Sequence, residues 1–218
     1  MGTFVINITL FIASFGQLLA GCKLTLLIAF CSTFIGMIGG TLIALGQRSH
    51  MRLLRFILDC YVAVIRGTPM IVQIVFWYYG LQLPFSPLIV AIIAIGCNSA
   101  AYISQVMATG IRTVDKGQLE AAQVMGFTTF QQIRYIILPQ ALRAVLPSLG
   151  NELVTMIKDS SLAYIIGVNE LFKESRNLIS TTYDVMTIYV AITLLYFIMT
   201  HSLTLLIKQA EKQLEKPC

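Results

Sequence analysis

The chain has 218 residues, of which 57% are hydrophobic and only 11% are charged, and its mean hydropathy is +0.80. A water-soluble domain carries about a quarter charged residues, so this composition excludes one and predicts a single all-α domain, residues 1–218, embedded in lipid. The net charge of +5 comes from short basic clusters beside apolar stretches. Such clusters orient a protein in a membrane, so nucleic acid is not an expected partner.

The apolar stretches predict five transmembrane helices, because about 20 apolar residues cross ~30 Å of hydrocarbon. The expected spans are residues 22–46, 57–80, 88–109, 147–167 and 184–207. Residues 1–17 are apolar but short, and we interpret them as an interfacial helix on the outer surface. If they cross the membrane instead, the protein has six spans and its N-terminus lies inside. Every later loop keeps its side in both cases.

Charge predicts which loops face the cytoplasm. The connection after the first span contains Arg48, Arg52 and Arg55, and the connection after the third span is also basic. Because cytoplasmic loops carry an excess of Lys and Arg, both connections and the lysine-rich C-terminus are expected inside. The uncharged "LQLPFSP" and the charge-balanced "NELFKESRNLISTTY" are expected outside.

Polar residues inside the second and third spans predict a site within the membrane. Arg66 lies near the middle of the second span, and Pro69 follows it, which kinks a helix and frees carbonyl groups. Arg66 could hold a substrate carboxylate or neutralise an acidic residue. In the third span, Asn98 and Tyr102 offer uncharged hydrogen-bonding groups. Polar residues in membranes also serve as helix-to-helix contacts, and that alternative stays open.

Residues 110–146 form a polar segment too long to be a tight turn. "LEAAQVM" favours a helix, and Gly126 can end it in the left-handed conformation. Thr128 and Gln131 have the spacing of a capping box, which starts a second helix at about 128–137. This helix carries an apolar stripe, Phe130, Ile133 and Ile137, and Pro139 is expected to stop it. The stripe can contact a partner, pack on its own spans or lie on lipid.

The fourth span contains four ionisable or amide residues: Asn151, Glu152, Lys158 and Asp159. A charge near the bilayer centre costs about 2.5–3.5 kcal/mol on insertion scales, so it needs a partner or a watery cavity. Glu152 and Asp159 are seven residues apart and lie on one helix face, about 10.5 Å apart along the axis. Two carboxylates on an inward face suit a ligand with an ammonium group. The candidate substrate-binding residues are Arg66, Asn98, Tyr102, Glu152, Thr155, Met156, Lys158 and Asp159. The alternative is that they pair structurally, for example Asp159 with Arg66.

No motif in the sequence supports an enzyme. HExxH, GxSxG and the P-loop GxxxxGK[ST] are all missing, and the five cysteines and two histidines have no metal-ligand spacing. We therefore expect no catalytic residue, metal or directly bound cofactor. Without a P-loop, the chain is not expected to hydrolyse ATP itself.

The pattern Glu120-Ala121-Ala122, then Gly126, then Ile136 and Leu138-Pro139 resembles the EAA loop of ABC-importer permeases at every defined position. "RGTPMIVQI", "NSAAYIS" and "LPSLGNELVTMIKDSSLAYIIGVNEL" also look like permeases of the polar amino acid group, the histidine, glutamine, glutamate and arginine importers. Many members have Glu and Arg after "AAYIS", where this chain has Gln105 and Ala108. An ion pair at that place is therefore in doubt.

This resemblance implies a type I ABC importer permease fold in the bacterial inner membrane. It implies that 128–137 is a coupling helix that inserts into a separate ATPase subunit. The residues it assigns to coupling are Glu120, Ala121, Ala122, Gly126, Thr128, Phe130, Ile133 and Pro139. The implied partners are an ATPase dimer, a second permease subunit (an identical copy or a sister) and an extracytoplasmic amino-acid-binding protein.

The expected function is therefore import of polar amino acids, basic or zwitterionic, by alternating access. A secondary amino acid transporter or a channel is the alternative, with the charges of the fourth span as ion sites. Such a carrier has no use for an exposed coupling helix, and the sequence shows no inverted repeat.

Overall fold

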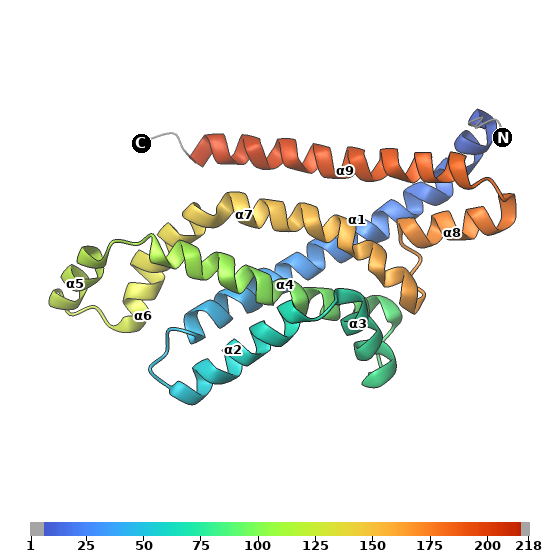
Figure 1. The fold of residues 1–218 in the computed structure, drawn as a ribbon. Coiled ribbons are helices and arrows are strands. Elements are labelled where there is room, and N and C mark those ends of the chain that lie inside the picture. Colours follow the sequence, from blue (N-terminus) through green and yellow to red (C-terminus); the bar gives the residue numbers. More distant parts are fainter. Residues whose placement is uncertain (1–6, 215–218) are drawn as a thin grey trace.

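The computed structural model describes residues 7–214, and every regular element in that range is a helix (Figure 1). The long helices lie side by side along one direction, as expected of an all-α membrane protein. The elements in chain order are α1 (Ile8–Gly46), α2 (Arg52–Gly67), α3 (Met70–Val75), the π-helical turn η1 (Phe76–Gly80), α4 (Pro87–Arg112), α5 (Lys116–Val124), α6 (Thr129–Gln132), the π-helical turn η2 (Ile133–Ile137), α7 (Leu138–Asp159), the 3₁₀ helix η3 (Ser160–Ile166), α8 (Leu171–Thr182) and α9 (Val185–Leu214).

The predicted spans correspond to α1, the pair α2 and α3–η1, α4, α7–η3 and α9. By length and composition, α1, α4 and α9 can each cross a membrane, and the bent pair makes a fourth candidate. Helix α7 is too polar for that test, because Arg143, Asn151 and Glu152 interrupt its apolar residues and Lys158 and Asp159 end it. It nevertheless packs against α1, α4 and α9, which is how a helix with charged residues is accommodated in a membrane bundle.

Helix α1 differs from the expected boundary between an interfacial helix and a first span. It runs unbroken from Ile8 to Gly46, about 58 Å at 1.5 Å per residue, so residues 8–17 are collinear with the first span. Residues 1–6 of the predicted interfacial helix lie outside the described residues. Gly21 lies within this helix. A Cβ there would lie 2.7 Å from Leu171 Cα, so Gly21 lets α1 pass close to the start of α8.

Helix α4 lies at the centre of the fold, between α1, α2 and α7. Its contact with α1 includes a hydrogen bond from Ser32 Oγ to the Ile92 carbonyl, 3.1 Å long. Buried small residues, among them Ala91, Ala94 and Ala101, bring the helix backbones close, as is usual where helices pack in membranes.

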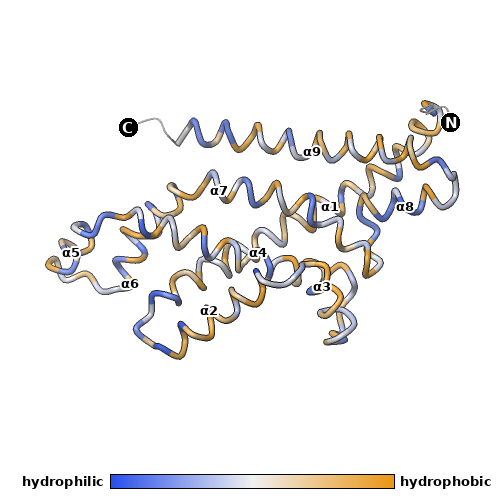
Figure 2. The backbone as a smooth tube through the Cα atoms, in the orientation of Figure 1, coloured by the Kyte–Doolittle hydropathy of each residue, from blue (hydrophilic) through white to orange (hydrophobic). Residues whose placement is uncertain are grey.

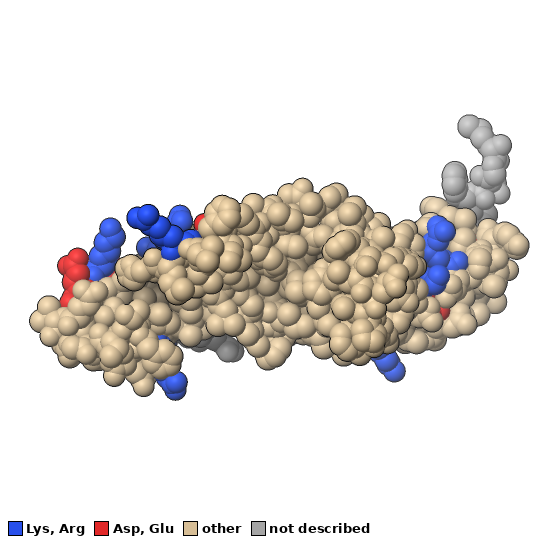
Figure 3. Space-filling view, turned by 90° about the horizontal axis from the view of Figure 1, so that it is seen from below, with Lys and Arg blue, Asp and Glu red and all other residues tan. Residues whose placement is uncertain are grey.

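Hydrophilic segments gather at the two ends of the bundle, and the long helices between them are mainly hydrophobic (Figure 2). One end contains the turn between α1 and α2, the segments α5 and α6, and the last turns of α9 (Figure 1). We call it the basic end, because Arg48, Arg52 and Arg55 lie there. Seen from below, charged side chains cluster near the ends and the middle is largely uncharged (Figure 3).

Candidate functional site

The second predicted span is broken at Thr68 and Pro69. Helices α2 and α3–η1 meet there at an angle of 109°, because Pro69 cannot donate a backbone hydrogen bond. Gln73 compensates for the break. Its side-chain nitrogen donates to the Ile65 carbonyl at 2.8 Å, to the Thr68 carbonyl at 3.1 Å and to Thr68 Oγ1 at 2.8 Å, and its oxygen accepts from the Asn98 amide at 2.9 Å. The break is therefore held to α4.

A cavity of about 340 Å³ lies against this break. We call it the carboxylate cavity. Its lining residues are Thr68, Pro69, Met70, Asn98, Tyr102, Glu152, Thr155, Met156, Asp159 and Leu162. Six of the eight residues predicted for substrate binding are among them, from both α4 and α7. Such a cavity, part apolar and part polar, is typical of small-molecule sites.

The two carboxylates lie on the same side of α7, as their spacing predicts. Glu152 Oε1 accepts a hydrogen bond of 3.2 Å from Ser99 Oγ on α4. The side chains of Glu152 and Asp159 are both partly buried. Within residues 7–214 as described, no lysine or arginine lies within ion-pair distance of either carboxylate. A pair of carboxylates facing one cavity can bind a cation or an ammonium group.

Arg66 and Lys158 are not among the lining residues. The Arg66 guanidinium lies over the ring of Tyr102, 5.4 Å from its centroid, which is cation–π distance. Arg66 is therefore at the edge of the carboxylate cavity, and the predicted alternative of an Arg66–Asp159 ion pair is not formed among the described residues. Lys158 is exposed, away from the lining that Glu152 and Asp159 share.

Sequence reasoning missed Gln73, Met70 and Leu162. Gln73 is an uncharged residue in an apolar run, and only its place four residues after Pro69 could have indicated that it satisfies the broken backbone. Met70 and Leu162 give no signal, because apolar residues in a span are equally suited to face lipid, a neighbouring helix or a cavity.

The segment between α4 and α7 forms the predicted two helices. Asp115 caps the first, α5, by accepting from the backbone nitrogens of Gly117 and Gln118 at 2.7 and 3.3 Å. Gly126 ends α5 with φ +80°, and Phe127 N donates to the Ala122 carbonyl at 2.9 Å, which is the hydrogen bond that closes a glycine-ended helix.

The predicted capping box is present at the start of α6. Gln131 N donates to Thr128 Oγ1 at 3.3 Å, and Thr128 N donates to Gln131 Oε1 at 2.8 Å. Each side chain thus satisfies a backbone donor that the helix start leaves free.

The expectation that Pro139 stops this second helix is wrong. The chain remains helical from Thr129 through η2 into α7, and Pro139 lies at the start of α7. The π-helical turn just before it is the physical reason: Leu138 N donates to the Ile133 carbonyl, five residues back. This wider turn accommodates a proline that a regular helix interior would exclude.

The predicted apolar stripe is divided between two environments. Ile137 is 6% exposed and packs in the core at the basic end, with Ile133 beside it. Phe130 is 68% exposed, and Val124 and Met125 at the end of α5 are 90% and 75% exposed. We call Val124, Met125 and Phe130 the loop tip. Of the other residues predicted for coupling, Glu120, Ala121 and Thr128 are exposed and Ala122 is buried.

Comparison with known proteins matches residues 32–216 to the family described as binding-protein-dependent transport system inner membrane component. The chain is 39% identical over 89% of its length, and 87% of the relative's, to a probable amino-acid ABC transporter permease protein, YckA, of Bacillus subtilis. It is 32% identical to the glutamine transport system permease protein GlnP of Escherichia coli, over 91% of this chain and 93% of the relative.

A solved structure, described as an amino acid ABC transporter with histidines, superposes with a TM-score of 0.88 at 32% identity, covering 96% of this chain and all of the other. Fold, length and sequence thus agree over nearly the whole chain. The chain belongs to the family of binding-protein-dependent transport inner membrane components, as the permease subunit of an amino acid ABC importer.

Proposed function

We propose that the loop tip docks into a separate ATPase subunit and that the basic end of the bundle faces the cytoplasm. The observation that carries this proposal is the exposure of Val124, Met125 and Phe130. Large apolar side chains exposed close together in the sequence of a polar segment favour a protein–protein interface. The basic residues at the same end give the orientation, because positive loops stay in the cytoplasm.

The capped helices around the loop tip support a mechanical role. Gly126, in the left-handed conformation, ends α5, and the capping box then starts a helix that continues without a stop into α7. A push on the loop tip therefore acts on the helix that carries Glu152 and Asp159. Closure of the ATPase subunits on ATP binding would move α7 and switch the side to which the carboxylate cavity opens, which is alternating access.

The carboxylate cavity is the proposed substrate site. Glu152 and Asp159 favour an amino acid with a positively charged or zwitterionic character, and Asn98 and Tyr102 supply neutral hydrogen-bonding groups. Arg66, at the edge, is placed to attract the α-carboxylate. Tyr102 is 40% exposed and Arg66 and Thr68 are also exposed, so the cavity has an open side that a second permease subunit would cover.

Co-purification tests the docking proposal. The chain, extracted from its own membrane, should bring down an ATPase in equal amount. Val124→Asp with Phe130→Asp should abolish that recovery, because it puts two charges into the proposed apolar interface. The double variant should still fold, because both side chains are exposed and neither supports the fold. Arg176→Asp, a change at an exposed residue on α8 at the opposite end, is the control. Full recovery of the ATPase with the double variant would refute the docking proposal.

Uptake tests the coupling and the substrate site separately. Gly126→Pro should abolish ATP-driven uptake while the chain still inserts, since proline cannot adopt φ +80°. Asp159→Asn should lower uptake of arginine more than uptake of glutamine, because it removes a negative charge. Equal losses for the two amino acids would show that Asp159 has a structural role only.

A further inference from the structure

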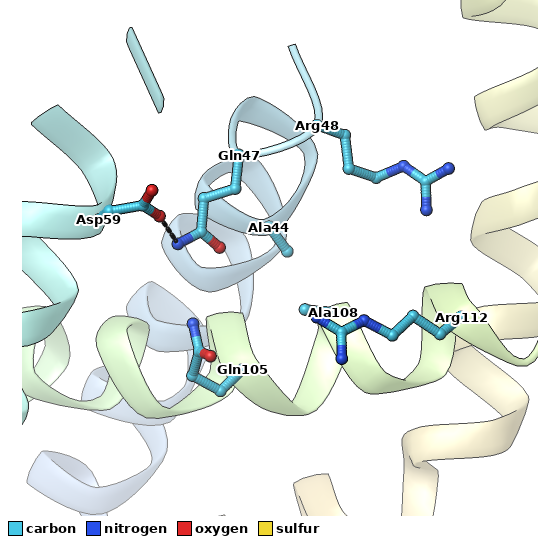
Figure 4. A pocket seen from close by; sticks show the side chains of 7 residues that line it. All are labelled: Ala44, Gln47, Arg48, Asp59, Gln105, Ala108 and Arg112. Atoms are coloured by element: carbon cyan, nitrogen blue, oxygen red, sulfur yellow. Dashed lines mark hydrogen bonds between the residues drawn. The ribbon is translucent and has the colours of Figure 1, made fainter. Parts of the chain in front are cut away.

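A second cavity, of about 290 Å³, lies at the basic end, apart from the carboxylate cavity. It lies between the last turn of α1, the middle of α2 and the last turns of α4 (Figure 4), and its charged residues Arg48, Asp59 and Arg112 are exposed. We call it the basic-end cavity. Its lining residues are Ala44, Gln47, Arg48, Asp59, Gln105, Ala108 and Arg112.

Both signs of charge face this cavity. Arg112 supplies a guanidinium group, and Asp59 supplies a carboxylate whose Oδ1 accepts a 2.8 Å hydrogen bond from Gln47 Nε2. The Arg48 side chain points away from Asp59 (Figure 4). Over the described part of the chain, neither arginine lies within ion-pair distance of a carboxylate. One hydrogen bond leaves most of the acceptor capacity of a carboxylate unused, so the cavity offers separate places for an anionic and a cationic group.

The conformation of the Arg112 side chain and the small residue Ala108 define one wall of the cavity. The Arg112 side chain folds back along α4, so that its guanidinium lies beside Ala108 (Figure 4). A larger residue at 108 would occupy the space that this guanidinium borders. Gln105, one turn earlier on α4, adds an amide with both a donor and an acceptor.

The basic-end cavity and the carboxylate cavity lie next to each other along α4. Tyr102 lines the first and Gln105 lines the second, and three residues of helix correspond to about 4.5 Å. The two cavities are also similar in volume, 290 against 340 Å³. A molecule small enough for one is therefore small enough for the other.

We propose that the basic-end cavity is a second amino-acid site, which binds the α-carboxylate at Arg112 and the ammonium group at Asp59. Asp59 argues against a simple phosphate site, because its negative charge repels a polyanion. This inference rests on the proposed function for the identity of the ligand and for the cytoplasmic position of the basic end. An amino acid bound there comes from the product side, so its binding would slow further import.

Equilibrium binding of labelled L-arginine and L-glutamine to the purified complex with its ATPase tests the proposal. Glu152→Gln with Asp159→Asn disables the carboxylate cavity, and this background variant should retain one bound amino acid per chain. Adding Ala108→Leu, which fills the basic-end cavity, or Arg112→Gln, which removes a guanidinium, should weaken the remaining binding at least tenfold. Arg112→Gln adds no volume and so covers the case in which Ala108→Leu fails to fold.

The matched controls are Thr109→Leu, the next residue on α4 and outside the lining, and Arg55→Gln, an exposed arginine of α2. Both should leave the remaining binding unchanged. The proposal is overturned if the background variant binds nothing, or if its binding survives both Ala108→Leu and Arg112→Gln. It is also overturned if short-chain phosphatidylethanolamine, which carries the same two charges, occupies the site and neither amino acid does.

If the carboxylate cavity is not the substrate site, the same binding measurement gives a different result. In that case the background variant binds as many amino acids as the wild type, whereas Ala108→Leu still removes the basic-end site. A wild type that binds neither amino acid overturns both proposals. Transport provides a second readout: amino acid loaded on the cytoplasmic side should inhibit wild-type uptake, and Arg112→Gln should relieve that inhibition.

Discussion

Gln73 offers the sharpest test of how the broken second span is held. Its side chain makes four hydrogen-bonding contacts: its nitrogen shares two hydrogens among three acceptors of Ile65 and Thr68 beside the break, and its oxygen accepts from Asn98 on α4. Leucine has nearly the same volume and makes none of them. The amide nitrogen has two hydrogens, so its three contacts count as two donated bonds, and the bond from Asn98 makes three. A net hydrogen bond contributes about 0.5–1.5 kcal/mol, and three would give about 1.5–4.5 kcal/mol. Thr68 is exposed and water can replace part of the loss, so we expect Gln73→Leu to destabilise the fold by about 2–3 kcal/mol.

The assay is thermal unfolding of the purified chain in detergent, with uptake measured in parallel. A loss of this size lowers the melting temperature by about 4–12 °C for a protein of this length. Uptake should fall as well, since Thr68, Pro69 and Met70 line the carboxylate cavity. Gln17→Leu, an exposed glutamine of α1, is the control and should leave both measurements unchanged. If Gln73→Leu melts with the wild type, these hydrogen bonds do not hold the break.

Two further predictions concern the contacts of α8. Gly21→Ala should destabilise the fold by about 1–3 kcal/mol, because the new Cβ meets Leu171 Cα at 2.7 Å, whereas Gly16→Ala, with nothing within 4 Å, should be harmless; equal melting temperatures would contradict the close approach. Burial raises the pKa of Glu170, in the connection between α7 and α9, to about 7 from 4.5, so its stabilising contribution is complete below pH 4.5 and is lost as the pH rises through 7. The melting temperature should fall over this window, and Glu170→Gln should flatten that fall; an unchanged profile would show that Glu170 is not its cause.

Much of the fold could be predicted because the signals are local. Apolar length located the long helices, and Pro69, Gly126 and the Thr128–Gln131 spacing marked a break, a helix end and a helix start through backbone chemistry that does not depend on distant residues. The seven-residue spacing of Glu152 and Asp159 correctly placed both on one face, since helix geometry fixes that relation.

The remaining features depend on tertiary contacts. The role of Gly21 has no local signal, because it serves the approach of Leu171, 150 residues later in the chain. Pro139 was expected to end a helix, and the π-helical turn η2 that accommodates it cannot be read from residue preferences. The exposure of Val124 and Met125 was missed as well, because only the packed bundle shows which apolar residues it leaves uncovered.

ATP-driven uptake in reconstituted vesicles tests most directly the claim that the loop tip links this chain to a separate motor. Vesicles that contain the permease alone should take up no amino acid against a gradient, with or without ATP. Uptake should appear when the ATPase and the binding protein are added, and Val124→Asp with Phe130→Asp should remove it. Concentrative uptake by the permease alone would contradict the account.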